Sequence, residues 1–133
     1  MLLLVYKGRE DLIPLWMLTS VLITYVYFKY IQVFSHMTKP ENITGSADIM
    51  LFRDGIKPMW EDIQNRSGGK FTLRMKKAGV AAIWEETLLA IIGEQLEGNE
   101  DVCGAVLSIR YHDDNLSVWH KTADNEEVIE KLK

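Results

Sequence analysis

The pattern that decides the fold is that of residues 70–76, KFTLRMK, in which apolar side chains alternate with polar or charged ones. Phe71, Leu73 and Met75 fall on one side of an extended chain, and a threonine and basic residues fall on the other. A period of two residues is typical of a β-strand with one buried face. Residues 81–97 change to helical spacing, with apolar side chains on one stripe and most glutamates outside it. The sequence therefore predicts a helix packed on a sheet.

Two further strands are expected after this helix. Gly98 is interpreted as the stop signal of the helix. Residues 102–111 and 115–120 are then predicted to pair as an antiparallel hairpin, joined by a polar connection of His112, Asp113 and Asp114. Beyond the hairpin, the tail from Asn125 to Lys133 is expected to begin another helix.

Length and charge limit the classes of function. A chain of 133 residues with 47% hydrophobic content can build one compact core but not two. Its formal net charge of -4 argues against a protein that neutralises a long run of phosphates, so a nucleic-acid ligand should be small. The single cysteine, Cys103, allows no internal disulfide and indicates a reduced, intracellular protein. We expect its thiol to be buried and inert.

The amino-terminal part differs in character from the remainder. Residues 1–45 hold seven charges that sum to +1, whereas residues 46–133 hold 27 that sum to -5. Residues 12–28 carry no charge, and a run of this length approaches that of a membrane-spanning helix. However, Pro14 and several hydroxyl side chains interrupt the run, and its β-branched residues equally favour buried strands. Both interpretations remain open.

Trp119 breaks the alternation of the last predicted strand. Leu116 and Val118 point to the apolar side, so the tryptophan falls on the polar side with Ser117. If the hairpin pairs as predicted, Arg110 shares this polar side. The ring either belongs to a binding site or packs against a loop or the terminal helix.

A second tryptophan, Trp60, lies beside Glu61 and Asp62 in a segment that Pro58 keeps out of regular structure. An indole next to a carboxylate suits a flat, positively charged ligand, because the ring face attracts the charge and the carboxylate accepts N–H donors. A methylated guanine offers both features. The alternative is a tryptophan that covers the core beside two solvated carboxylates.

Metal, cofactor and catalytic chemistry are not expected. The three histidines have no metal-ligand spacing with Cys103 or with one another. No nucleophile and base lie in an arrangement typical of an enzyme.

Five segments, the turn SGGKF (67–71) and four longer ones, resemble the initiation factor 4E family in their order and spacing. The longer segments are LFRDGIKPMWED (51–62), IWEETLLAIIGEQL (83–96), DVCGAVLSIR (101–110) and SVWHKTA (117–123). The resemblance covers residues 31–133 and is closest to the 4E-homologous-protein subgroup. It implies an α+β domain with a curved antiparallel β-sheet and helices on its convex face. It also implies a cytoplasmic translation factor, not an enzyme, that binds the 7-methylguanosine cap of messenger RNA.

The resemblance assigns roles to five residues of the cap site. Trp60 matches the second of two stacking tryptophans, and Glu61 matches the carboxylate that pairs with the guanine edge. Trp119 matches the residue that touches the N7-methyl group. Arg110 and Lys70 match basic residues near the phosphate chain, and both suit charge-assisted contacts with an anion.

The resemblance also implies a partner surface on the convex helical side. Trp84, Glu86 and Gly93 match the helix on which the initiation scaffold factor 4G or 4E-binding proteins lay their own helix. Residues 1–30 do not align with the family, which leaves the first stacking ring unassigned. Ile31 falls where the family has a partner-anchoring tryptophan.

These departures leave two alternatives to cap binding. One is a cap-incompetent relative that regulates translation through its helical face, and the other is a variant tethered to a membrane by residues 12–28. Asn115 occupies a position that is often lysine in the family, which implies a weaker hold on phosphate. A third interpretation of the first 30 residues is that they are not native sequence of the family.

Overall fold

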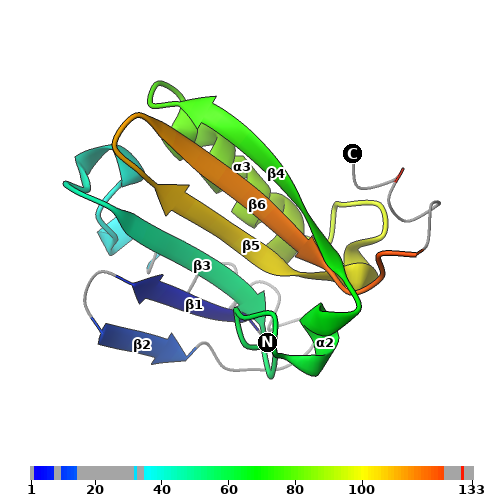
Figure 1. The fold of residues 1–133 in the computed structure, drawn as a ribbon. Coiled ribbons are helices and arrows are strands. Elements are labelled where there is room, and N and C mark those ends of the chain that lie inside the picture. The colour runs from blue at the N-terminus through cyan, green and yellow to red at the C-terminus, as the bar shows by residue number, and fades with distance from the viewer. Residues whose placement is uncertain (1, 8–9, 15–31, 33–34, 125–129, 131–133) are drawn as a thin grey trace.

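The structure of this chain is a computed structural model that describes residues 2–7, 10–14, 32, 35–124 and 130 (Figure 1). Its strands are β1 (Leu2–Lys7), β2 (Glu10–Pro14), β3 (Ala47–Arg53), β4 (Gly69–Lys76), β5 (Val102–Ile109) and β6 (Asp113–His120). Its helices are α2 (Ile63–Arg66) and α3 (Val80–Ile92), with short 3-10 helices η1 (Pro40–Asn42) and η2 (Asn99–Asp101).

The strands form one antiparallel sheet in the order β2-β1-β3-β5-β6-β4. Helix α3 runs across one face of this sheet, behind β4, β5 and β6 in Figure 1. The α+β class, with a curved antiparallel sheet and helices packed on its convex face, is therefore confirmed. We call the opposite side of the sheet the open face.

Cross-strand register assigns alternate residues to the two faces. Leu107 pairs with Ile49 on one side and Leu116 on the other, so these three side chains point together towards α3. They join one buried apolar cluster with Trp84 and Leu88 of the helix. This cluster is the main core, and burial of such side chains stabilises the domain by about 1.5–3 kcal/mol each.

The predicted helix is confirmed, but it ends earlier than expected. Trp84, Leu88 and Ile91 recur at helical spacing and are at most 2% exposed, so they form the buried stripe of α3. The expected stop at Gly98 is wrong, because the helix ends at Ile92 with Gly93 as its C-cap. The next residue, Glu94, takes a left-handed conformation with φ 53°, which ends the helical ladder.

The predicted hairpin is also confirmed, with a shifted connection. The turn consists of residues 110–112, whereas His112 to Asp114 were expected, and β6 already begins at Asp113. Asp114 is buried, and its Oδ1 atom accepts the Nζ of Lys77 at 2.6 Å and the backbone N–H of Arg110 at 3.0 Å. These two hydrogen bonds allow the Asp114 carboxylate to be buried inside the sheet. The sequence alone does not predict this burial, because the partners of Asp114 are not evident from it.

The described part of the amino-terminal segment joins the sheet. β1 pairs with β3 along its length, and β2 pairs with β1 at the edge. Residues 15–28 of the uncharged run lie outside the described residues, and so does the expected helix from Asn125 except for residue 130. Within the described ranges, no helix combines the length and the apolar character needed to cross a bilayer. The division into segments 1–30 and 31–133 stays a prediction.

Candidate functional site

One end of the open face carries a row of four paired residues. Phe52 pairs with Gly104, Gly104 with Trp119, and Trp119 with Lys70, so all four side chains share this face. The Trp119 ring is 7% exposed and meets the Phe52 ring edge-on at 5.8 Å. A β-carbon on Gly104 would lie 2.3 Å from the carbonyl oxygen of Leu51 and 2.6 Å from the Phe52 ring. Only glycine therefore allows the two rings to pack here.

Trp60 covers Trp119 from the loop between β3 and α2. The two ring centroids are 4.1 Å apart with planes inclined by 37°, and Trp60 is 44% exposed. The Nζ atom of Lys70 lies 5.7 Å from the Trp60 centroid and 5.5 Å from the Trp119 centroid. A cation thus already rests against both indoles, an arrangement stabilised by the negative ring faces.

Two side chains hold the Trp60 loop in place. The amide Nδ2 of Asn65, which is 1% exposed, donates to the carbonyls of Lys57 at 2.7 Å and Met59 at 2.9 Å. Asp62 caps α2 by accepting the N–H of Gln64 at 2.9 Å, and its other oxygen accepts the N–H of Lys57 at 2.9 Å. These bonds fix the backbone on both sides of Trp60.

The two carboxylates that follow Trp60 have different roles. Both oxygens of Asp62 accept hydrogen bonds from backbone N–H groups. These bonds lower the pKa of Asp62 below its ordinary value of 3.8, the one from Lys57 more than the one from Gln64. Glu61 is exposed, and it has no hydrogen bond or ion pair within the described part of the chain. Glu61 is therefore the carboxylate that is available to a ligand.

Trp119 also presents a polar atom at this place. Its Nε1 is buried and has no hydrogen-bond partner among the residues that the structure describes. A buried donor of this kind is costly unless it is satisfied. We call the group formed by Trp60, Glu61, Lys70 and Trp119 the tryptophan site.

Arg110 lies on the same face but not in the tryptophan site. It follows β5 six residues after Gly104, on the order of 20 Å along a strand. Its guanidinium donates to Asp48 Oδ1 at 2.8 Å and to the carbonyls of Ala47 and Ile109. The strand register ends at the pair of Ser108 and Asn115 and does not include Arg110, but the guanidinium reaches Asp48, which lies opposite Ser108 on the open face. The structure does not bring the side chains of Arg110 and Trp119 together.

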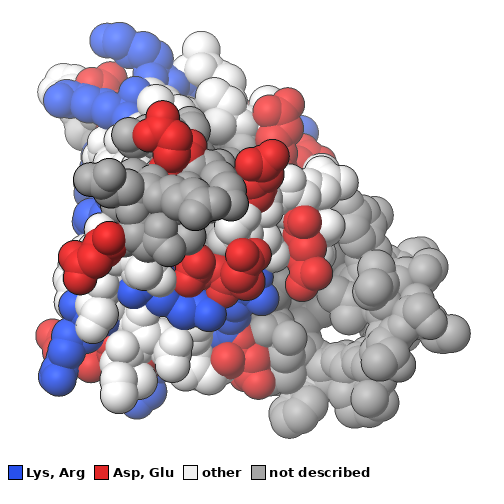
Figure 2. Space-filling view, turned by 90° about the vertical axis from the view of Figure 1, so that its right-hand side faces the viewer, with Lys and Arg blue, Asp and Glu red and all other residues white. Residues whose placement is uncertain are grey.

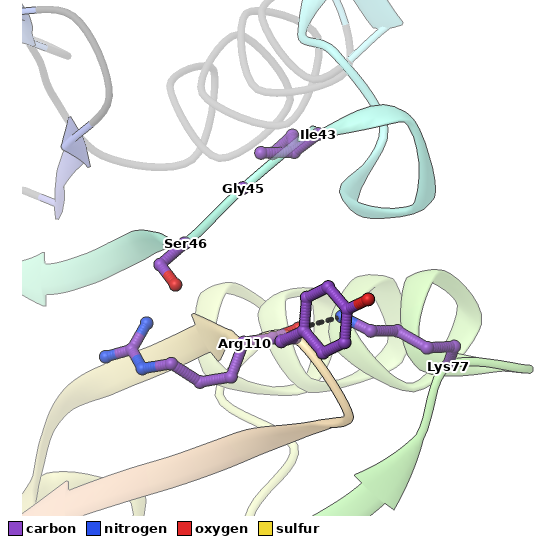
Figure 3. A pocket seen from close by; sticks show the side chains of 6 residues that line it. Ile43, Gly45, Ser46, Lys77 and Arg110 are labelled. Atoms are coloured by element: carbon purple, nitrogen blue, oxygen red, sulfur yellow. Dashed lines mark hydrogen bonds between the residues drawn. The ribbon is translucent and has the colours of Figure 1, made fainter.

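A hollow of about 210 Å³ adjoins Arg110 at this distant end of the sheet. It lies between the segment with Ile43, Gly45 and Ser46 and the β5–β6 turn with Arg110 and Tyr111 (Figure 3). Lys77 enters from the side, where its Nζ donates to the carbonyl of Arg110 and to Asp114. Both cations of this hollow therefore already have carboxylate partners.

Cys103 fills space beneath the tryptophan site. Its side chain belongs to a small buried cluster with Phe52, Ile56 and Trp119. Burial raises the pKa of the thiol to about 11, so very little reactive thiolate exists near neutral pH. The expectation of a buried thiol is confirmed.

The three residues assigned to a partner surface are not equivalent. Trp84 is 1% exposed and packs in the core, so its ring supports α3 from below and cannot touch a partner. Glu86 and Gly93 are exposed, and their spacing of seven residues puts both on the outer side of the helix. Only these two can meet a partner directly.

Sequence reasoning missed the residues that build the tryptophan site from behind. Phe52, Gly104 and Asn65 hold the two indoles, yet each has an unremarkable local pattern. Asp62 did carry a signal, because aspartate is favoured at a helix N-cap. Within the described ranges, no group of three or more metal-ligating side chains occurs.

Comparison with protein families gives a specific match. The family described as Eukaryotic initiation factor 4E matches residues 23–133. The chain is 42% identical over 100 residues to Eukaryotic translation initiation factor NCBP of Oryza sativa subsp. japonica, covering 75% of this chain and 44% of that protein. It is 41% identical over 102 residues to Eukaryotic translation initiation factor 4E-4 of Caenorhabditis elegans, covering 77% and 48%. The chain thus spans less than half the length of these relatives.

Solved structures agree with this match. The complex of C. elegans eIF4E-3 with the 4E-binding protein Mextli and cap analog has a TM-score of 0.84 at 26% identity, covering 98% of this chain and 76% of that one. The complex of Ascaris suum eIF4E-3 with m7G cap has a TM-score of 0.83 at 27% identity, with the same coverage.

The first prediction concerns the pH dependence of the Trp60 loop. Because the folded pKa of Asp62 is lowered, its contribution to stability is complete above about 3.8 and is lost as pH falls through the folded pKa. In an NMR titration, the Asp62 carboxyl signal should move with a midpoint below 3.8, and the Lys57 and Gln64 amide signals should move with it. In Asp62→Asn these amide transitions should vanish. A midpoint at or above 3.8 would contradict the hydrogen bonds described here.

Proposed function

This chain belongs to the eukaryotic initiation factor 4E family, and we propose that it binds the 7-methylguanosine cap of messenger RNA at the tryptophan site, in translation initiation or its regulation. The observation that carries the proposal is the cation held against two indoles beside an unpaired carboxylate. A methylated guanine offers a positively charged ring and two adjacent N–H donors, which are complementary to these groups. Relatives of this fold have been solved with cap or a cap analog.

In this proposal the base stacks on Trp60 and pairs with Glu61. The centroid distance of 4.1 Å leaves no room for a third ring between Trp60 and Trp119, because a sandwiched ring needs about twice that separation. The base therefore lies on the half-exposed outer face of Trp60, or Trp60 turns away from Trp119 to admit it. The Lys70 ammonium leaves the rings in either case and turns to the phosphates, which are the stronger partner for it.

Arg110 is assigned to the distal end of a bound ligand. It shares the open face with the tryptophan site, so a ligand whose base rests on Trp60 can extend its phosphate chain in that direction. The chain must compete with Asp48 for the guanidinium, since the Arg110–Asp48 distance is 2.8 Å. Ion pairs this exposed are worth about 0–1 kcal/mol, so the exchange is inexpensive.

The outer side of α3 supports a second role, in protein binding. Ala82, Glu86, Ala90 and Gly93 recur along one stripe of the helix, and the small side chains let another helix approach the backbone around the Glu86 carboxylate. We propose that a 4E-binding protein or the initiation scaffold factor 4G lies on this stripe. The related C. elegans eIF4E-3 has been solved with the 4E-binding protein Mextli.

The cap proposal is tested by Trp60→Ala and Glu61→Gln. Titration with 7-methylguanosine triphosphate should quench the tryptophan fluorescence of the wild type, and the quenching should be lost in Trp60→Ala. In calorimetric titration, the affinity of Trp60→Ala should fall about 30-fold, the equivalent of about 2 kcal/mol for a desolvated cation–π contact. Glu61→Gln should lose at least about tenfold, since it removes charge-assisted hydrogen bonds.

Two matched variants control this experiment. Met59→Ala removes a neighbour of Trp60 that is 45% exposed on the same loop, and Asp54→Asn removes an exposed carboxylate near the loop. Both should bind the nucleotide like the wild type. Unchanged affinity in Trp60→Ala would refute the stacking role.

The partner proposal is tested by charge reversal on α3. Glu86→Lys should weaken binding of Mextli by at least about tenfold in calorimetric titration, because it leaves a partner charge facing a like charge. Glu85→Lys, one residue further around the helix by about 100°, should have little effect. Equal losses in both variants would mean that the general charge of α3 matters and the stripe does not.

A further inference from the structure

The strand β4, at the opposite edge of the described sheet from β2, carries a line of basic side chains on the open face. Lys70 pairs with Trp119, Arg74 with Asn115 and Lys76 with Asp113, so the three cations point to the same side as the tryptophan site. The side chain of Arg74 is 74% exposed and that of Lys76 is 89% exposed. We call Lys70, Arg74 and Lys76 the β4 stripe.

The β4 stripe has an excess of positive charge. Asp113 is the one carboxylate that contacts it within the described part of the chain, at 2.9 Å from Arg74 and 3.8 Å from Lys76. Two cations therefore share one carboxylate, and Lys70 contacts ring faces only. Contacts this exposed contribute about 0–1 kcal/mol, so a phosphate group can take the place of Asp113.

The spacing of the stripe suits a chain of phosphates. Alternate residues of a strand are about 7 Å apart, so Arg74 and Lys76 are separated by one such step and Lys70 and Arg74 by two. Between Lys70 and Arg74 lies Thr72, whose hydroxyl is 2.9 Å from that of Ser117 and adds further polar atoms. An extended single strand of nucleic acid presents its phosphates at a comparable interval.

The segment that follows α3 is a poor route for a nucleic acid. The segment after α3 carries the exposed side chains of Glu94, Glu97 and Glu100. Figure 2 shows several Asp and Glu side chains on the side of the molecule where this segment lies, to the right in Figure 1, together with a band of Lys and Arg side chains. Three exposed glutamates repel phosphates, whereas the β4 stripe, Lys70, Arg74 and Lys76, attracts them.

The stripe starts at the tryptophan site and leads away from it. Lys70 touches both indoles, and the other two cations continue along the same strand. We propose that the β4 stripe binds the backbone phosphates of the RNA nucleotides that directly follow the cap. Arg74 and Lys76 then contact the phosphate backbone and not the bases. This inference rests on the proposed function, because the cap sets where the RNA begins.

The experiment compares three probes: 7-methylguanosine triphosphate, a capped RNA of a few nucleotides, and the same RNA without a cap. Affinities are measured between 50 and 200 mM salt for the wild type and Arg74→Gln/Lys76→Gln. For the capped RNA, the slope of log affinity against log salt should become shallower by about 1.4 in the double variant, at about 0.7 for each phosphate contact. Across this range the wild type should lose about sevenfold more affinity than the double variant.

Two controls separate the stripe from the cap site. Affinity for 7-methylguanosine triphosphate should be unchanged in the double variant, which also shows that the variant is folded. Lys39→Gln removes one positive charge at an exposed lysine before η1, outside the β4 stripe, and should leave the slope for capped RNA as it is.

The outcomes distinguish this inference from the cap proposal. In the wild type, equal salt dependence of the affinities for capped RNA and for 7-methylguanosine triphosphate would overturn the proposed role of the β4 stripe. An equal loss of affinity for both probes in the double variant would overturn it too. If the wild type failed to bind the nucleotide, cap recognition would be wrong. The uncapped RNA would then test the β4 stripe alone. A salt-dependent affinity of the wild type that is lost in the double variant would support binding at the stripe, and the absence of such a difference would refute it.

Discussion

The contact between Trp60 and Trp119 is the interaction on which the account of this molecule depends. Trp119 is set by the sheet, whereas Trp60 comes from an irregular loop and reaches it only because Asn65 and Asp62 fix that loop. With these hydrogen bonds in place, the Trp60 ring lies against Trp119 and the Lys70 ammonium, and Glu61 follows it on the same loop. The chemistry of the site is therefore a consequence of how a short loop is anchored.

The sheet supplies the other half of this constraint. Gly104 lets the Phe52 and Trp119 rings approach the backbone of β3 and β5, and the α3 core on the opposite side keeps those strands together. One face of the sheet thus packs the main core, and the other carries the tryptophan site. The same register that aligns the core residues also aligns the basic side chains of β4 with the tryptophan site.

Local periodicity predicted the parts of the fold that depend on neighbours in sequence. The alternation of residues 70–76 and the placement of Trp119 on the polar face followed directly from a period of two. The end of α3 could not be predicted in this way, because Gly93 and Gly98 are equally good stop signals in the sequence. The structure shows that the helix ends at the first of them, where Glu94 takes a left-handed conformation. The role of Asn65 and the pairing of Arg110 with Asp48 depend on residues far apart in the chain, and no local pattern contains them.

The central claim is that the tryptophan site recognises a positively charged purine by its face and its edge. Its most direct test is the ratio of the affinities of the wild-type protein for 7-methylguanosine triphosphate and for unmethylated guanosine triphosphate. The two nucleotides share the N1–H and exocyclic amine donors and the phosphates, and they differ at N7, where the methyl group puts a positive charge on the ring. The account predicts a preference of about 30-fold for the methylated form, equivalent to about 2 kcal/mol. Equal affinities would contradict it.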